Sequence, residues 1–313
     1  APLKNFFQVF LFMSENPTGL QVLFNGETYR AFELPRRYLP TFLALTLTES
    51  VWPLFLLGLA TAAWKTVTTI RTRWLNKTIA AQELPITNYQ LPTTDIVPLW
   101  DYWLLITAFV IPFLYVITLQ PPMYDGFRHF LFIVPPIFIT AGFAFQAIFN
   151  ALAKFSNKQV KENSRHSLIR EIRVKALPSI LLLALLAPNL LAIARLHPYE
   201  YAYYNSFIGG TGGAFRTYET DYWLTCYKEA VEQINLRAPA TLYVHREAYI
   251  AARYATTALT VRETRGNLAA IGPDDLVLVN TRTNEDRKTF HDAPIVLEVG
   301  RDGATFCVVK QVP

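Results

Sequence analysis

Four long apolar segments constrain the fold of this 313-residue chain more than any other feature. They cover residues 39–64, 98–119, 130–153 and 176–196, and each contains few charged side chains. A helix of roughly 20 apolar residues crosses the hydrocarbon core of a bilayer, which is about 30 Å thick. The sequence therefore predicts four transmembrane helices between residues 38 and 196.

The overall composition agrees with a membrane class. Charged residues make up 17% of the chain and hydrophobic residues 52%, whereas soluble domains are about 25% charged. A net charge of +5 in a soluble protein would suggest nucleic-acid binding. Here the basic residues lie beside the apolar segments, so we interpret them as topology signals and expect no nucleic-acid partner.

Basic residues between the apolar segments predict the orientation of the helices. Those between the third and fourth segments are Lys154, Lys158, Lys161, Arg165, Arg170, Arg173 and Lys175. Those between the first and second segments are Lys65, Arg71, Arg73 and Lys77. Basic loops stay on the cytoplasmic side. Residues 1–37, the connection 120–129 and residues 197–313 are then expected outside the cytoplasm, in a multi-pass protein of a prokaryotic-type plasma membrane.

The beginning of the chain does not resemble a secretory signal peptide. An N-terminus outside the cytoplasm needs an export signal, so we expect an earlier membrane portion upstream of Ala1. The apolar stretch 6–13 is too short to span a bilayer and suits an interfacial helix. Residues 1–37 are accordingly interpreted as an extracytoplasmic loop or interfacial segment.

Residues 197–313 have the pattern of a small mixed α/β domain. Short β-type runs cover 241–244, 258–261, 276–279, 295–299 and 305–309, with a hairpin turn at 300–303 and a short helix at 248–254. Another helix is indicated by apolar residues at helical spacing, namely Trp223, Tyr227, Ala230, Val231 and Ile234. Thr220 or Asp221 is its expected cap. The predicted fold class is a membrane all-α bundle followed by an extracytoplasmic α/β domain.

The connection before the third apolar segment reads QPPMYDGFRHFLFIVPP and contains Asp125, Arg128 and His129. An arginine at this depth suits phosphate binding, because its planar guanidinium donates paired hydrogen bonds and stays charged. The alternative is an interfacial arginine that reaches lipid headgroups or pairs with Asp125.

Two carboxylates, Glu49 and Asp101, lie inside or at the end of predicted spans. Carboxylates are costly there and so are functional candidates. A buried structural partner explains Glu49 equally well, and Asp101 suits the cytoplasmic interface.

The segment GETYRAFELPRRYLP contains Arg37. It suits either a polar cleft above the membrane or a solvated loop.

The stretch HPYEYAYYNSFIGGTGGAF contains Tyr204 and Asn205. Its glycines lack the spacing of phosphate-binding loops. Its tyrosines suit stacking on a sugar or peptide, or an interfacial aromatic belt.

Metal-ligand clusters and the GxSxG, HExxH and Walker motifs are absent from the sequence, so we assign no catalytic residue and no metal. The pairing of Cys226 with Cys307 stays open.

Three segments in order, FNGETYRAFELPRRYLPTFLALTLTE, YDGFRHFLFIVPPIF and HPYEYAYYNSFIGGTGGAF continuing into YETDYWLTCYKEAVEQIN, carry a family resemblance. Over residues 22–235 the chain resembles the C-terminal half of membrane glycosyltransferases that use polyprenyl-phosphate sugars. These are the dolichyl-phosphate-mannose protein mannosyltransferase-like proteins, glycosyltransferase family 39, of the multi-spanning GT-C class.

This resemblance implies transfer of a sugar from a lipid phosphate carrier to a protein, lipid or glycan acceptor on the outer face of the membrane. It implies no cofactor, and it leaves a divalent ion open. Arg128 would lie near the phosphate of the carrier, with Tyr124 and His129 lining the same region. The family's catalytic carboxylate belongs to an earlier outward loop without a counterpart here, so the base that deprotonates the acceptor is expected upstream of Ala1.

Two other classes of function remain open from sequence. A transporter or channel subunit usually shows repeated spans and glycine-interrupted helices, and neither pattern is visible. A non-catalytic membrane anchor that presents the C-terminal domain to partners is the other alternative. It differs from an enzyme in that it would tolerate loss of Arg128.

Overall fold

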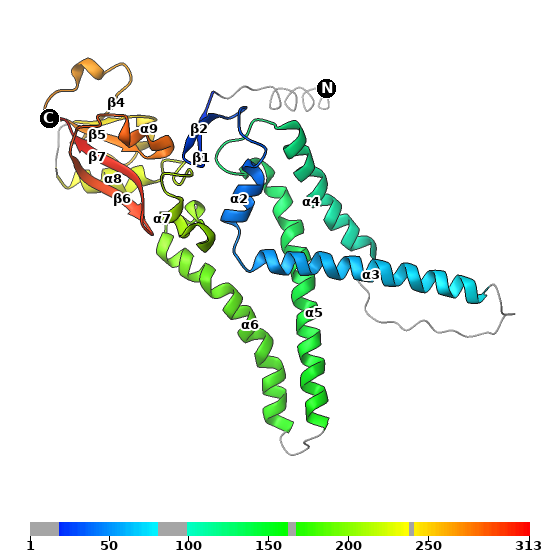
Figure 1. Cartoon of the computed structure of the whole chain (residues 1–313). Helices are drawn as coiled ribbons and strands as arrows, with labels where there is room; N and C mark the ends of the chain where they lie inside the picture. The colour runs from blue at the N-terminus through cyan, green and yellow to red at the C-terminus, as the bar shows by residue number, and fades with distance from the viewer. Residues whose placement is uncertain (1–18, 81–98, 162–166, 238–240) are drawn as a thin grey trace, which may run out of the picture. The chain divides into compact units, whose positions relative to one another are not determined.

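The computed structural model describes residues 19–80, 99–161, 167–237 and 241–313 (Figure 1). The chain divides into two compact units. The first, here called the sheet unit, contains Ala1–Leu47, Leu119–Arg128 and Pro188–Pro313. The second, the helical unit, contains Thr48–Thr118 and His129–Ala187.

The helical unit is built from most of four long helices, α3 (Val51–Ala80), α4 (Leu99–Leu119), α5 (Val134–Lys161) and α6 (Ser167–Leu196). The 3₁₀ helix η1 (Arg128–Ile133) leads into α5. Four stretches within these helices are long and apolar enough to cross a membrane: Val51–Leu75, Trp100–Leu119, Arg128–Leu152 and Ser179–Leu196. The prediction of four such helices is confirmed.

The first predicted span, residues 39–64, is wrong as a single helix. A short helix, α2 (Tyr38–Thr46), ends where Leu47 turns to extended backbone, and α3 restarts at Val51. The apolar side chains of Tyr38, Leu39 and Phe42 are buried inside the sheet unit, so protein rather than lipid covers them. Glu49 consequently lies in the break between two helices and not inside a span.

The basic segments from which the orientation was predicted are also more helical than expected. Helix α3 continues to Ala80, so Lys65, Arg71 and Arg73 lie on a helix rather than in a loop. Helix α5 likewise reaches Lys161 before α6 begins at Ser167. Lysine and arginine are good helix formers, which allows a helix to extend beyond its apolar part.

Close packing between α3 and α5 depends on a glycine. A Cβ atom added at Gly58 would overlap the backbone carbonyl of Thr140, a buried residue of α5. A polar contact is also present in this unit, where Lys65 Nζ donates to the hydroxyl of Tyr102 at 2.8 Å. The Tyr102 ring in turn packs on Phe143, with ring centroids 4.6 Å apart.

The sheet unit contains a five-stranded mixed sheet of order β4-β3-β5-β7-β6. Its strands are β3 (Thr241–Val244), β4 (Thr260–Glu263), β5 (Leu276–Asn280), β6 (Ile295–Arg301) and β7 (Ala304–Gln311). Strand β3 runs parallel to β4 and to β5, whereas β7 is antiparallel to β5 and β6. The predicted strands are confirmed, with β4 beginning two residues later than expected.

Positive φ angles at Asp302 and Gly303, 49° and 79°, form the two-residue turn between β6 and β7. Such angles match the twist of a tight hairpin. The hairpin turn predicted from the glycines at 300–303 is therefore confirmed.

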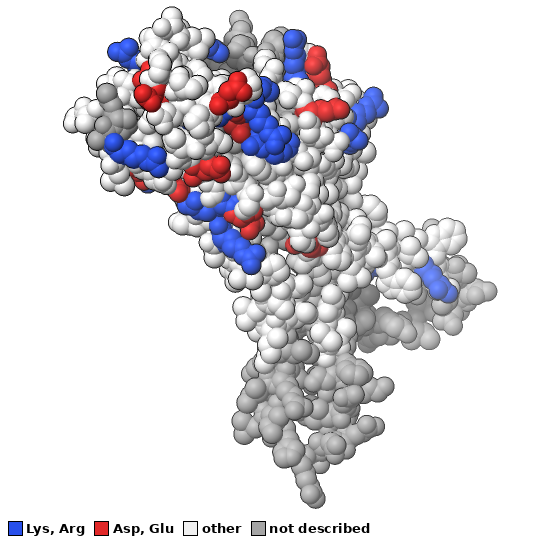
Figure 2. Space-filling model, turned by 60° about the vertical axis from the view of Figure 1, so that its left-hand side comes forward, with Lys and Arg blue, Asp and Glu red and all other residues white. Residues whose placement is uncertain are grey.

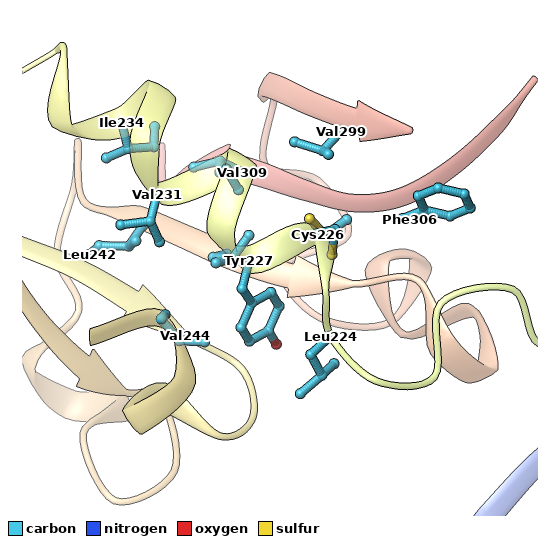
Figure 3. Packing of buried hydrophobic residues seen from close by; sticks show 14 of the residues in the cluster. Leu224, Cys226, Tyr227, Val231, Ile234, Leu242, Val244, Val299, Phe306 and Val309 are labelled. Atoms are coloured by element: carbon cyan, nitrogen blue, oxygen red, sulfur yellow. The ribbon is translucent and has the colours of Figure 1, made fainter. Parts of the chain in front are cut away.

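Helix α8 (Cys226–Asn235) covers the sheet with an apolar face. Figure 3 shows Tyr227, Val231 and Ile234 of α8 packed with Leu242 and other strand residues. The N-cap of α8 is Thr225, so the prediction of Thr220 or Asp221 as the cap residue is wrong. The Asp221 carboxylate nevertheless accepts hydrogen bonds from the backbone N–H groups of Trp223, Thr225 and Cys226 at the start of the helix. Trp223 itself lies before the helix and is 53% exposed, so its predicted place on the buried face is wrong.

The remaining elements of the sheet unit are short. They are η2 (Glu200–Ala202), η3 (Ser206–Ile208), α7 (Gly210–Ala214), α9 (Ala248–Ala252), η4 (Leu268–Ala270) and η5 (Arg282–Arg287). Cys226 and Cys307 are both buried and are free thiols in this structure.

A hairpin that the sequence analysis missed lies within residues predicted to be a loop. Strands β1 (Gln21–Phe24) and β2 (Glu27–Arg30) pair across an Asn25-Gly26 turn, which is a strong hairpin signal. The Phe24 ring packs against Tyr38 and Tyr218, with centroids 5.2 and 5.6 Å away. The predicted interfacial helix at 6–13 lies outside the described residues.

Charged side chains are distributed unequally over the described surface. In Figure 2, red and blue side chains crowd the sheet unit, whereas the described surface of the long helices is almost entirely white. An apolar helix surface of this kind is expected of segments that face lipid.

Candidate functional site

The loop before α5 is fixed in the sheet unit by backbone contacts. The N–H of Gly126 donates to the Tyr38 hydroxyl at 3.1 Å, and the N–H of Met123 donates to the carbonyl of Ala31 at 3.1 Å. Gly126 has a φ of +70°, a conformation that favours glycine. These contacts give Asp125 and Arg128 defined positions.

Two arginines and two carboxylates meet at this loop and form a group that we call the charged cluster, Asp125, Arg128, Glu219 and Arg282. Arg282 of η5 is central, because its Nη2 lies 2.6 Å from Asp125 Oδ1 and its Nε lies 3.0 Å from Glu219 Oε1. Arg128 Nη1 lies 3.0 Å from Asp125 Oδ2. Each oxygen of Asp125 therefore faces a different guanidinium.

Asp125 and Glu219 are only 4% and 2% exposed. Glu219 Oε2 has no hydrogen-bond partner among the described residues. Burial raises the pKa of the Glu219 carboxyl to about 7, since the loss of hydration outweighs the attraction of Arg282. With both arginines and Asp125 charged, the cluster is neutral when Glu219 is ionised and carries one positive charge when Glu219 is protonated.

This raised pKa predicts a pH-dependent stability that a Glu219→Gln variant lacks. The folded state holds the Glu219 proton more tightly than the unfolded chain does, so rising pH between about 4.5 and 7 lowers the free energy of unfolding. One proton contributes a slope of about 1.4 kcal/mol per pH unit in this interval. Denaturant unfolding of the purified protein at several pH values measures the slope. Equal slopes in wild type, Glu219→Gln and the exposed control Glu232→Gln would contradict the prediction.

Of the two arginines in the cluster, Arg128 has the more accessible side chain. Its side chain is 31% exposed, against 14% for Arg282. The guanidinium lies over the ring of Tyr124, with Cζ 4.6 Å from the ring centroid. Asp125 and Tyr124 therefore hold a partly exposed cation in a fixed orientation, an arrangement suited to binding an oxyanion.

Three other predicted site residues are Arg37, Glu49 and His129. Arg37 is exposed, with its guanidinium 5.8 Å from the centre of the Phe24 ring. Glu49 and His129 belong to the helical unit, Glu49 in the break before α3 and His129 as an exposed residue of η1.

Tyr204 and Asn205 are used inside the fold. The Tyr204 hydroxyl donates to the Glu219 carbonyl at 2.8 Å. The Asn205 amide donates to the carbonyls of Ala44 and Leu47 at 2.7 Å each, which ties down the end of α2. Because both side chains are buried, we assign them structural roles in the fold.

Two members of the charged cluster were missed from sequence. Glu219 stands in the YETDYW segment next to the predicted cap, and Arg282 stands in the polar run TRTNEDRK. Arg282 is 157 residues from Asp125 in sequence. No local pattern distinguishes it from the other surface-type arginines, so only the tertiary contact identifies it.

Comparisons with models of protein families, with curated proteins and with solved structures give no match. Within the described ranges, no group of three or more histidine, cysteine, aspartate or glutamate side chains is placed to hold a metal ion.

Proposed function

We propose that the chain is a glycosyltransferase, or the donor-binding part of one, that acts on a polyprenyl-phosphate sugar at the outer face of a membrane. The observation that carries this proposal is Arg128, a cation held by Asp125 and Tyr124 at the first residue of a membrane-length apolar stretch. In a bilayer, the end of such a stretch would lie near the phosphate groups of lipids. The ordered sequence motifs described above support the same class.

The chemistry of such a reaction requires a cation on the donor side. When the bond between the sugar carbon and the phosphate oxygen breaks, negative charge develops on the departing polyprenyl phosphate. A fixed guanidinium stabilises that charge without reorganising. Arg282 has a positioning role in this proposal, because it orients Asp125 and through it Arg128. We assign no catalytic base within the described residues.

The proposed topology is multi-pass in a plasma membrane, with the sheet unit on the extracytoplasmic side. This topology is supported by two basic parts of the sequence, residues 65–77 and residues 154–175. They carry the positive charge that is expected on the cytoplasmic side. Single cysteines introduced between Lys154 and Lys175 should resist an impermeant thiol reagent in intact cells. Labelling of that stretch from outside would contradict this topology.

An Arg128→Ala variant tests the proposed role of the cation. In the complete protein, reconstituted with a polyprenyl-phosphate sugar, we expect transfer to fall by about 100-fold or more, as for loss of one charge-stabilising donor. Arg128→Lys should recover only part of the rate, because an ammonium lacks the planar fork. Arg253→Ala, which removes an exposed arginine of the sheet unit, is the control.

Binding provides a second measurement that does not need turnover. Wild type and Arg128→Ala are placed in lipid nanodiscs with and without a polyprenyl phosphate, and the lipid that stays bound to each protein is measured. Wild type should retain the polyprenyl phosphate in preference to phosphatidylglycerol, and Arg128→Ala should not. Unchanged transfer and unchanged lipid selectivity in Arg128→Ala would overturn the proposal and favour a non-catalytic anchor.

A further inference from the structure

A cavity in the sheet unit lies at the carboxyl ends of its parallel strands. It has a volume of about 480 Å³ and is lined by His245, Arg246, Thr264, Arg265, Leu268, Thr289 and Phe290. His245 and Arg246 directly follow β3, and Thr264 and Arg265 directly follow β4. None of these residues belongs to the charged cluster.

The topology of the sheet explains why a cavity forms at this edge. From β3 the chain passes through α9 to β4 on one side, whereas from β5 it continues to β6 on the other side of the sheet. Connections that leave neighbouring parallel strands in opposite directions open a crevice outside their carboxyl ends, and ligands of open α/β sheets bind there. Here β3 and β5 are those neighbours.

The lining has more guanidinium donors than the surrounding protein uses. Glu285 is the nearest acidic partner, but its oxygens lie 3.6 Å from His245 Nε2 and 3.7 Å from Arg246 Nη2. These separations exceed the 2.7–2.9 Å typical of charge-assisted hydrogen bonds. Arg265 makes no ion pair with any described residue. Two guanidinium groups thus line the cavity with donors available to a ligand.

The walls of the cavity are held in place before any ligand binds. Thr264 N–H donates to the Val244 carbonyl at 2.9 Å, which joins the segment after β4 to the end of β3. On the far side, Lys310 Nζ donates to the carbonyls of Thr289 and Phe290 at 3.0 and 2.9 Å. A preformed site loses less conformational entropy when it binds.

We propose that this cavity binds a small organic phosphate. Guanidinium groups from two different loops and an imidazole line the space. The hydroxyls of Thr264 and Thr289 also line it, but they already donate to the His245 carbonyl and to the Glu285 carboxylate, so the guanidinium groups are the main donors. A phosphate monoester offers three terminal oxygens to such donors, whereas one arginine fork already satisfies both oxygens of a carboxylate. Leu268 and Phe290 supply an apolar wall for the organic part.

Calorimetric titration of the purified full chain with three probes tests the site: phenyl phosphate, inorganic phosphate and benzoate. We expect saturable binding with phenyl phosphate tightest, inorganic phosphate weaker because it lacks the apolar part, and benzoate weakest. Tightest binding of benzoate would overturn the phosphate assignment. Lack of saturable binding by either phosphate at millimolar concentration would overturn the site itself.

Substitutions matched in charge separate a site from general attraction of anions. Arg246→Gln with Arg265→Gln should weaken phenyl phosphate binding by at least 30-fold. The control, Arg253→Gln with Arg262→Gln, removes two exposed arginines of the same unit that do not line the cavity. Its affinity should stay within about 2-fold of wild type. Equal weakening in the two double variants, with both showing wild-type thermal unfolding, would mean that net charge alone attracts the anion and would overturn the proposal.

Discussion

Arg282→Ala is expected to lower the free energy of unfolding by about 3–5 kcal/mol, the usual cost of removing one partner from a buried ion pair. Arg282 faces two carboxylates that are almost wholly buried, Asp125 and Glu219. Without the guanidinium, Asp125 retains Arg128, but Glu219 loses its cationic partner in the cluster. Its carboxyl must then take up a proton or remain charged without compensation.

Denaturant unfolding at pH 8 measures this effect best, because Glu219 is mostly ionised above its pKa of about 7. The destabilisation should become smaller toward pH 5, where a protonated Glu219 no longer needs the cation. Arg287→Ala is a matched control, since Arg287 is an exposed arginine of the same 3₁₀ helix. A loss in Arg282→Ala no larger than in Arg287→Ala would show that the cluster contributes little to stability.

Lys310→Met is expected to lower the free energy of unfolding by about 2–4 kcal/mol. The Lys310 side chain is only 3% exposed, and its Nζ donates to the carbonyls of Asp286, Thr289 and Phe290 at 2.6, 3.0 and 2.9 Å. Methionine fills similar space but donates nothing. The Phe290 carbonyl keeps the N–H of Ala293 as a donor, whereas the carbonyls of Asp286 and Thr289 lose theirs, and a buried carbonyl left without a donor costs about 1–3 kcal/mol. Relief from burying a charge offsets part of that cost.

The same substitution should loosen one wall of the cavity. Thr289 and Phe290 are on the segment that Lys310 holds, so hydrogen exchange of residues 286–290 should quicken in Lys310→Met. The control is Lys228→Met, which changes an exposed lysine of α8. Equal stability and equal exchange in both variants would show that the three hydrogen bonds are not needed to fix this segment.

The long helices and the strands could be predicted because their signals are local. Apolar runs of sufficient length identify α4 and most of α5 and α6, and alternating β-type residues identify β3, β5 and β7. Asp221 was one of two expected caps; its side chain does bond to backbone groups a few residues away, but α8 begins later than expected and its N-cap is Thr225. The β1–β2 hairpin also has a local signal, the Asn25-Gly26 pair, and was predictable from sequence for the same reason.

Part of the candidate site was also visible in the sequence, because Tyr124, Asp125 and Arg128 lie within five residues of one another. Their mutual contacts follow from that spacing once the loop is ordered. Tyr204 and Asn205 have the residue types of a sugar-binding surface, but residue type does not reveal burial. Their hydrogen bonds to Glu219, Ala44 and Leu47 assign them to the fold.

By itself the sequence determined that this chain has four helices of membrane length and a mixed α/β domain, since chain length, apolar content and alternation are properties of neighbouring residues. Only the tertiary structure decided that residues 38–46 leave the first span to pack in the sheet unit, and that Arg282 joins Asp125 and Glu219. Both depend on partners far away in sequence. Whether an apolar helix meets lipid or protein, and which carboxylate an arginine neutralises, is a matter of what surrounds it after folding.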